Sequence, residues 1–329
     1  TMEIELGRGK RARRAYTFDD IAVVPSRRTH NPEDVSTSWS IDAFQFDIPV
    51  LGAPMDSVVS PQTAIMLGQL GGLGVLDLEG LWTRYDDPTP YLAEIAGLAD
   101  VQATARMQQL YSAPIRPELV TARQRRIVTI EPLNLKKFIY DLDVPVIVGG
   151  AATYTAALHL MRTGAAGVLV GFGGGAASTT RATLGIHAPM ATAVADVAGA
   201  RRDYLDESGG RYVHVIADGG VGTSGDIVKA LAMGADAVML GVALARATDA
   251  PGQGFHWGPE AHHAKLPRGH RVKVDQVATL EAVLYGPAPV ADGTANLIGA
   301  LKKSMATTGY SDLKEFQRVD VVVAPSPTR

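Results

Sequence analysis

The chain has 329 residues, 46% of them hydrophobic and 20% charged, which is enough apolar material for one large α/β core or for two smaller ones. Its formal net charge of -3 creates no general positive field, which argues against nucleic acid as a partner. Cysteine is absent, so disulfides, thiolate zinc sites and a thiol nucleophile are excluded.

The N-terminus, TMEIELGRGKRARR, is charged and lacks an apolar core, and no apolar run approaches the roughly 18 residues of a membrane span. We therefore expect a cytoplasmic protein without membrane contact. The basic run KRARR at residues 10–14 is interpreted as a solvated arm or subunit contact rather than a nucleic-acid patch.

Strand and helix patterns alternate along most of the chain, which predicts an α/β fold with a parallel sheet. The expected strands cover residues 46–51, 74–78, 127–130, 144–148, 166–170, 213–217 and 237–240. The expected helices cover residues 61–70, 90–98, 101–111, 117–125, 133–140, 153–163, 224–232 and 294–305. Most of these strands end in glycine, which favours a TIM (β/α)8 barrel with its ligand at the carboxyl ends of the strands over a doubly wound sheet.

The strand pattern is one short of a closed barrel, because seven strands are recognised where a (β/α)8 barrel has eight. The stretch 112–144 shows few strand signals, so one βα unit is either degenerate or missing there. If a segment is missing, we expect the gap to lie between Arg126 and Ile127. We expect residues 1–329 to form a single catalytic barrel domain with a loop-rich flap at about 246–294 and no inserted second domain.

The most informative stretch is 213–244, which holds two strands that each end in a glycine turn with a short amphipathic helix between them. Ser224 lies where the N-cap of that helix is expected. Asp218, Gly219 and Gly220 follow the first strand, and Gly241 follows the second. In a parallel sheet these glycines come together, so their N–H groups can bind a phosphate while the aspartate accepts from a ribose hydroxyl.

A second glycine-rich stretch, GFGGGAASTTR at residues 171–181, follows the strand expected at 166–170. Its carbonyls could surround a monovalent cation and its amides could hold a phosphate, while a flexible linker remains the alternative.

Four motifs resemble those of the IMP dehydrogenase and GMP reductase family: FDIPVLGAPMDSV, GVLVGFGGGAASTTR, IADGGVGTSGDIVKALAMGADAVMLG and ATDAPG. Within the family the chain is most similar to the bacterial IMP dehydrogenase-related paralogue that lacks the regulatory CBS domains. The resemblance implies a TIM barrel that binds a purine nucleoside monophosphate (GMP, IMP or XMP) with NADP or NAD. It also implies a potassium ion and a homotetramer or octamer.

The resemblance also implies roles for individual residues. The substrate would be bound by Met55, Asp218, Gly219, Gly220, Gly241, Gly258, Glu260 and Gln276. Asp218 would hold the ribose, Gly220 and Gly241 the 5′-phosphate, and Gln276 the purine edge. Gly173, Gly175 and the carbonyl of Ser178 would match the potassium loop, and Ser178 and Thr180 would be catalytic.

The chain departs from the family at several of these positions. Ser178 stands where the family has its cysteine nucleophile, and a serine hydroxyl is a far weaker nucleophile near neutral pH. Ala176 and Val242 replace serines that contact the phosphate, and the flap lacks the Arg-Tyr pair that activates water in the dehydrogenases. Thr180, the proton relay of both reactions, is present.

These departures favour an NAD(P)-dependent enzyme that is closer to GMP reductase than to IMP dehydrogenase. Two alternatives stay open: a purine-nucleotide-binding protein that has lost turnover, and an engineered chain in which Ser178 replaces a natural cysteine. Glu260 is a candidate acid. His256, His262 and His263 lie in the flap, where we favour solvated or capping roles over metal ligation, with a substrate contact from one of them in a closed flap as the alternative.

Overall fold

The computed structural model describes residues 3–123, 128–129, 139–140, 142, 144–263 and 271–324. Its centre is a parallel sheet in the order β10-β11-β12-β13-β6-β7. The strands are β6 (Val50–Gly52), β7 (Leu73–Gly74), β10 (Ile147–Ala151), β11 (Gly167–Val170), β12 (His214–Asp218) and β13 (Ala237–Leu240). Their apolar side chains are mostly buried, as expected for a sheet covered on both faces.

Two further strand pairings have the order that a barrel requires. After Val75 the chain passes from β7 into β8 (Leu76–Asp77), which pairs in parallel with β9 (Val128–Thr129). The first strand of the series, β6, pairs with β13 near the other end of the sequence, and this is how a (β/α)8 sheet closes on itself.

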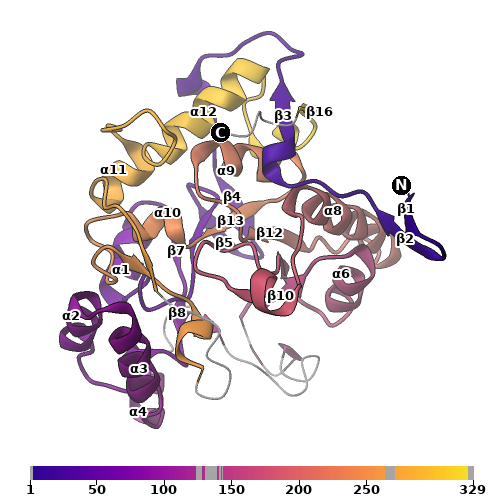
Figure 1. Ribbon diagram of the computed structural model, residues 1–329. Helices are drawn as coiled ribbons and strands as arrows, with labels where there is room; N and C mark the ends of the chain where they lie inside the picture. The colour runs from indigo at the N-terminus through magenta and orange to yellow at the C-terminus, as the bar shows by residue number, and fades with distance from the viewer. Residues whose placement is uncertain are drawn as a thin grey trace.

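Helices surround these strands, and Figure 1 shows β12 and β13 near the centre with α6 and α8 on one side and α1, α10 and α11 on the other. The helices are α1 (Pro61–Gln69), α6 (Tyr154–Met161), α7 (Thr180–Leu184), α8 (Met190–Glu207), α9 (Ser224–Ala232), α10 (Val242–Ala245), α11 (Leu280–Tyr285), α12 (Leu297–Thr308) and α13 (Leu313–Phe316). Of these, α7, α8, α10, α11 and α13 were not among the elements expected from the sequence. Within the described part of the chain, no helix is long and apolar enough to cross a membrane.

Several element boundaries differ from the expected ones for a local reason. Residues 46–51 do not form one strand, because Pro49 lacks an N–H: Phe46 ends β5 (Phe44–Phe46), which pairs with β4 (Trp39–Ile41), and β6 begins at Val50. Pro145 likewise delays β10 to Ile147. The N-cap of α9 is Thr223 rather than Ser224, because Thr223 and Asp226 form a reciprocal capping box. The helix expected at 133–140 lies largely outside the described residues.

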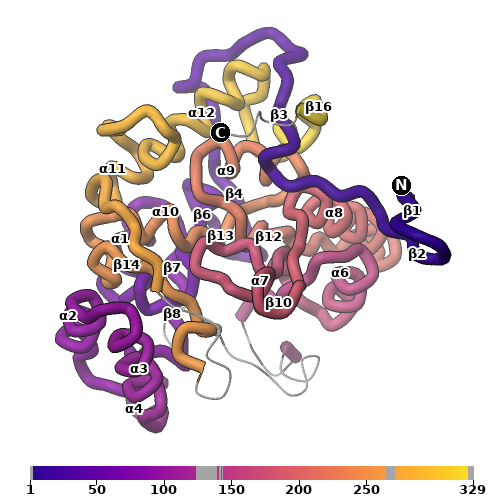
Figure 2. Tube along the Cα trace, viewed as in Figure 1, coloured from indigo at the N-terminus to yellow at the C-terminus, as the bar shows by residue number. Residues whose placement is uncertain are grey.

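Between β8 and β9 the chain forms a separate lobe of η3 (Leu81–Thr83), α2 (Thr89–Gly97), α3 (Asp100–Tyr111) and α4 (Pro117–Arg123). Figures 1 and 2 show α2, α3 and α4 grouped at one corner of the molecule. The lobe has its own small apolar core, to which Trp257 and Ala261 also contribute.

The remaining elements are short. The hairpin of β1 (Glu3–Gly7) and β2 (Lys10–Arg13) is almost wholly exposed, and Figure 1 shows it extending from the body beside α8. The other pairs and turns are β3 (Ile21–Val24) with β16 (Asp320–Val323), β14 (Phe255–His256) with β15 (Val272–Lys273), and the single turns η1 (Phe18–Asp20), η2 (Pro32–Asp34) and η4 (Pro259–His262).

Candidate functional site

The carboxyl ends of β11, β12 and β13 bring the predicted glycines together. Gly171, directly after β11, is so close to β12 that a Cβ on it would lie 1.8 Å from the carbonyl oxygen of Asp218. Gly219 and Gly220 follow β12 with φ of +109° and +70°, a region that glycine enters without steric cost. Glycine is therefore required here for the close approach and for the turn.

The backbone donors at this edge are not equally free. The N–H of Gly220 donates to the carbonyl of Gly174 at 2.9 Å, so the predicted phosphate contact from Gly220 requires that bond to be exchanged. No bond from the N–H of Gly241 to another described loop or turn acceptor is found. Of the two predicted phosphate donors, Gly241 is the one that is available.

Asp218 ends β12 at the same edge, and its carboxyl group makes no hydrogen bond or ion pair with the described residues. Burial raises the pKa of this carboxyl from 3.8 to about 6. A largely buried carboxylate without a partner is costly, and hydroxyl donors from a ligand would satisfy it.

The predicted catalytic residues meet a third side chain from the flap. The hydroxyls of Ser178 and Thr180 each donate to Oε1 of Glu260, both at 3.3 Å, and the N–H of Thr180 donates to Ser178 Oγ at 3.4 Å. A carboxylate that accepts from two hydroxyls is arranged to take or give a proton through either of them.

Glu260 belongs to a segment, residues 255–262, that we call the strap. The strap links Glu260 to the strand ends through Met55. A Cβ on Gly258 would lie 3.6 Å from Met55 Cε, and one on Gly241 would lie 3.8 Å from Met55 Sδ. The predicted positions Met55, Gly241, Gly258 and Glu260 therefore form one continuous surface with Ser178. Gln276 is exposed, and its amide donates to the carbonyl of Ala247 at 3.2 Å rather than to a residue of this surface.

The strap is anchored by buried polar contacts that the sequence analysis did not foresee. The indole N–H of Trp257 donates to the hydroxyl of Tyr111 at 3.2 Å, which in turn donates to Asp56 Oδ2 at 2.5 Å. The ring of His262 stacks on Tyr111 with centroids 3.6 Å apart. Ser57 donates to the carbonyl of Trp257 at 3.1 Å. These contacts join residues far apart in sequence, and the sequence analysis identified none of them.

Two carboxyl groups, Asp56 of this anchor and Asp77 next to it, interact electrostatically. Burial raises the pKa of Asp56 to about 6, although the hydrogen bonds from Tyr111 and from the N–H of Leu81 act in the opposite direction. Burial and the charge of Asp56 raise the pKa of Asp77 to about 7. This pair holds a proton near neutral pH because burial disfavours the charge on each carboxyl group and the charge of Asp56 further disfavours ionisation of Asp77.

A potassium ion at Gly173, Gly175 and Ser178 stays a prediction. In this loop the N–H of Ser178 donates to the carbonyl of Gly175 at 3.0 Å, which leaves that oxygen a second lone pair. Among the described residues, no group of three or more His, Asp or Glu side chains could hold a metal ion.

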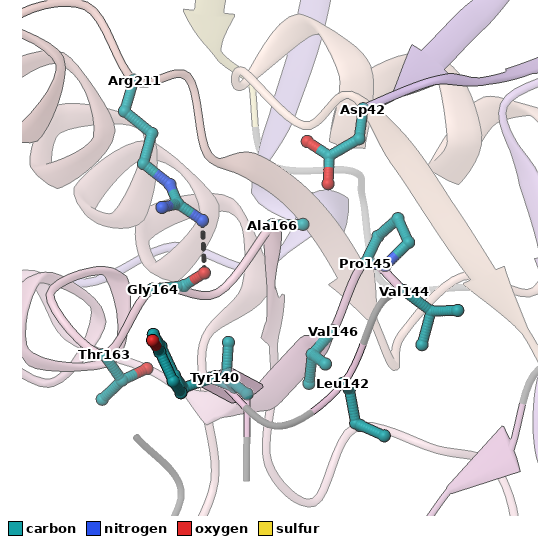
Figure 3. A pocket seen from close by; sticks show the side chains of 11 residues that line it. Asp42, Tyr140, Leu142, Val144, Pro145, Val146, Thr163, Gly164, Ala166 and Arg211 are labelled. Carbon is teal, nitrogen blue, oxygen red and sulfur yellow. Dashed lines mark hydrogen bonds between the residues drawn. The ribbon is translucent and has the colours of Figure 1, made fainter. Parts of the chain in front are cut away.

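A cavity of about 630 Å³ lies at the opposite end of the strands (Figure 3). Its lining includes Val146, Ala166 and Arg211, which precede β10, β11 and β12. Ligands of α/β barrels bind at the carboxyl ends of the strands, so we do not assign this cavity to the substrate.

Comparison with known proteins identifies the same family and fold as the sequence motifs. The model of the IMP dehydrogenase / GMP reductase domain matches residues 15–80 and 120–327. A crystal structure of an IMP dehydrogenase/GMP reductase-like protein from Corynebacterium glutamicum superposes with a TM-score of 0.91 at 44% identity, covering 98% of each chain. The predicted TIM barrel fold is therefore confirmed.

Two curated relatives bear on the chain's length and its function. An uncharacterized oxidoreductase of Mycolicibacterium smegmatis is 46% identical over 372 positions, covering 97% of this chain and 99% of the relative. Because 372 exceeds the 329 residues of this chain, the relative carries residues that have no counterpart here. An inosine-5′-monophosphate dehydrogenase of Methanocaldococcus jannaschii is 25% identical over 472 positions, covering 96% of this chain and 94% of the relative. The missing unit expected near residues 126 and 127 stays a prediction, because these lengths do not place it.

Proposed function

The chain belongs to the IMP dehydrogenase/GMP reductase family, and from that premise we propose that it is an NAD(P)-dependent oxidoreductase that converts GMP to IMP. The reaction transfers a hydride to C2 of the purine and releases the 2-amino group: GMP, NAD(P)H and one proton give IMP, NAD(P)⁺ and ammonia. The purine is reduced and the nicotinamide is oxidised.

This proposal rests mainly on one observation: the hydroxyls of Thr180 and Ser178 both donate a hydrogen bond to Glu260. A reductive deamination needs a proton donor for the leaving nitrogen, and it needs no residue that activates water. Glu260 is the acid, and Thr180 passes its proton to the amino group. Asp218 accepts from the ribose hydroxyls, and Gly241 donates to the phosphate.

The loop after β11 fits a nicotinamide cofactor beside this site. The hydroxyl of Thr179 and both ring nitrogens of His187 are buried without hydrogen-bond partners among the described residues, and a shift of this loop that exposes them would let them hold the polar groups of the cofactor. The bound cofactor supplies the hydride. The contribution of the chain is to hold the purine C2 next to Ser178 and Glu260 and to deliver the proton.

Ser178 favours a second candidate, a purine-nucleotide-binding protein without turnover, since a serine hydroxyl is a poor nucleophile unless a base activates it. In either case we propose that residues 1–329 act as one barrel domain with the flap at 246–294, assembled as a homotetramer in the cytoplasm.

Measurement of nicotinamide absorbance separates the two candidates. The protein and the Ser178→Cys variant are each mixed with GMP and NADPH or NADH, and separately with IMP and NAD⁺ or NADP⁺. We expect GMP-dependent oxidation of the reduced cofactor, faster by roughly tenfold or more in Ser178→Cys because a thiol is the better nucleophile.

Binding of GMP without turnover in both forms would favour the second candidate. Turnover of IMP alone would reverse the proposed direction. If neither GMP nor IMP binds, both candidates are wrong.

A further inference from the structure

Arg271 is a buried cation to which the proposed function gives no role. It is 4% exposed and directly precedes β15, the strand that pairs with β14 of the strap. Its guanidinium donates hydrogen bonds to the carbonyls of Ile95 and Leu98. Its ion-pair partner among the described residues is Asp100, whose side chain is 74% exposed and lies 3.5 Å from Nε. Burial of a guanidinium beside so weak a counter-charge is costly, so we looked for what the residue holds in place.

The two carbonyls that accept from Arg271 lie at the end of α2 in the lobe. This helix has no basic residue in its own last turn. The last carbonyls of a helix have no partner within the helix, and the negative end of the helix dipole favours a cation. Arg271 supplies that cation from outside the lobe, and it thereby attaches the start of β15 to α2.

The same guanidinium lies over the ring of Phe255, with Cζ 3.8 Å from the ring centroid. Phe255 is the first residue of the strap and is paired with Lys273, and the N–H of Val274 donates to the carbonyl of Gly254 at 2.8 Å. A planar guanidinium can stack on a ring while its N–H groups bind two carbonyls, whereas an ammonium group binds as a point charge. Arg271 therefore joins both strands at the base of the strap, β14 and β15, to the end of α2.

This attachment is separate from the one made by Tyr111, which contacts Trp257 and His262. Arg271 acts at the base of the strap, and Tyr111 acts on either side of Glu260. The lobe thus holds the strap at two places, and both are needed to fix the position of the carboxyl group between them.

We propose that Arg271 is a positioning residue, which holds the strap so that Glu260 reaches the hydroxyls of Ser178 and Thr180. The inference rests on the proposed function, because it takes Glu260 as the acid. Both hydrogen bonds to Glu260 are 3.3 Å long, beyond the usual range for a hydroxyl donor. A small displacement of the strap would therefore separate the acid from the residue that passes on its proton.

The test measures GMP-dependent oxidation of the reduced cofactor at saturating GMP by Arg271→Lys and Arg271→Gln. The lysine keeps the charge near α2 but cannot bind both carbonyls and stack on the ring, and the glutamine loses the charge as well. We expect kcat to fall by about tenfold or more in Arg271→Gln and by less in Arg271→Lys. GMP affinity should fall less than kcat, because Asp218 and Gly241 bind the nucleotide from the strand ends.

Glu260→Gln separates positioning from a general effect on the fold. If Arg271 acts through Glu260, then Arg271→Gln should cause little further loss of kcat when Glu260→Gln is already present. An equal loss of kcat in both backgrounds would overturn the inference.

Arg106→Gln is the matched control. Arg106 also joins two elements of the lobe: it donates to both carboxylate oxygens of Glu94 in α2 at 2.8 and 2.9 Å, and it lies 5.9 Å from the ring centroid of Tyr91. These contacts do not involve the strap. The control variant should leave kcat unchanged, and a loss equal to that of Arg271→Gln would contradict the assigned role.

Hydrogen exchange of the peptide covering residues 255–262 tests the inference without turnover. Exchange should become faster in Arg271→Lys and stay unchanged in Arg106→Gln. Unchanged exchange in Arg271→Lys would overturn the inference. If the wild-type chain binds GMP without turnover, or does not bind it, the proposed function fails and the exchange result still decides whether Arg271 holds the strap. If Arg271→Gln does not fold, Arg271→Lys replaces it in the kinetic measurements.

Discussion

At the residue scale, Asp218 shows a conflict between stability and ligand binding. Its carboxyl group ends β12 largely buried and without a partner, and its pKa is raised from 3.8 to about 6. A raised carboxyl pKa means that the folded state binds the proton more tightly than the unfolded state does. The ionised group therefore destabilises the fold above about pH 6, and this cost disappears as the pH falls toward 4.

We predict that Asp218→Asn raises the free energy of unfolding at pH 7 by up to about 3 kcal/mol, because it removes the buried charge. The same variant should lose nucleoside and nucleotide binding, since an amide accepts hydroxyl donors less strongly than a carboxylate. Urea unfolding at pH 7 and pH 4, with GMP titration on the same samples, measures both effects. A variant that is less stable at pH 7, or equally stabilised at both pH values, would contradict the role assigned to Asp218.

At the element scale, the strap depends on the lobe that inserts between β8 and β9. The family model leaves residues 81–119 unmatched, and this gap covers η3, α2, α3 and the start of α4. Tyr111 at the end of α3 accepts from Trp257 and stacks on His262, on either side of Glu260 in the chain. The lobe therefore fixes the position of the candidate acid without reaching the site itself.

We predict that Tyr111→Phe loosens the strap while keeping the ring that stacks on His262. The variant removes the hydroxyl between Trp257 and Asp56, which costs about 1–3 kcal/mol of stability, and it raises the pKa of Asp56 because a hydrogen bond that lowers that pKa is lost. Hydrogen exchange of the peptide covering residues 255–262 should become faster, and GMP affinity should fall.

Tyr85→Phe is the matched control, since the hydroxyl of Tyr85 donates to the carbonyl of Leu110 on the same helix rather than to a residue of the strap. Its loss of stability should not be accompanied by faster exchange at residues 255–262. If both variants accelerate exchange there equally, the strap responds to lobe stability in general and not to the Tyr111 hydroxyl.

Elements that carry a local signal were predictable from the sequence. Glycine turns and apolar periods placed β11, β12, β13 and α9 to within one or two residues. Predicted strand boundaries were wrong at residues 49 and 145, where a proline lacks the backbone N–H that a β-ladder needs. The helix α8 was missed although its buried residues recur at helical spacing, because no capping side chain marks its start after Pro189.

Without the family resemblance, the candidate site was predictable only where neighbouring strands define it. Asp218, Gly220 and Gly241 follow from the rule that parallel strands deliver their carboxyl ends to one edge. The hydrogen bonds of Glu260 to Ser178 and Thr180, and those of Trp257 to Tyr111, join segments about 80 and 146 residues apart. A single sequence contains no period or spacing that encodes such contacts, because they are set by how the strap and the lobe pack.

At the scale of the whole molecule, each end of the barrel holds a buried aspartate, but only one of the two is paired with cationic side chains. Asp236, just before β13, accepts from Arg201 at 2.8 Å, from Lys314 at 2.5 Å and from the hydroxyl of Tyr212 at 2.7 Å. Burial opposes its ionisation, but the charges of Arg201 and Lys314 hold the pKa of Asp236 below its ordinary value. Asp218, at the carboxyl end of the adjacent strand, has no such partners.

We predict that Asp236→Asn destabilises the fold at pH 7 by about 3–5 kcal/mol, because Arg201 would remain buried without its counter-charge. A carboxyl with a lowered pKa stabilises the fold above its ordinary value of 3.8 and loses that contribution as the pH falls through its folded pKa, so the difference from wild type should shrink in acid. GMP affinity under native conditions should be unchanged. Unfolding curves for Asp218→Asn and Asp236→Asn at pH 7 should therefore shift in opposite directions. A shift in the same direction would contradict this contrast, in which the aspartate at one end of the barrel serves ligand binding and the aspartate at the other end serves stability.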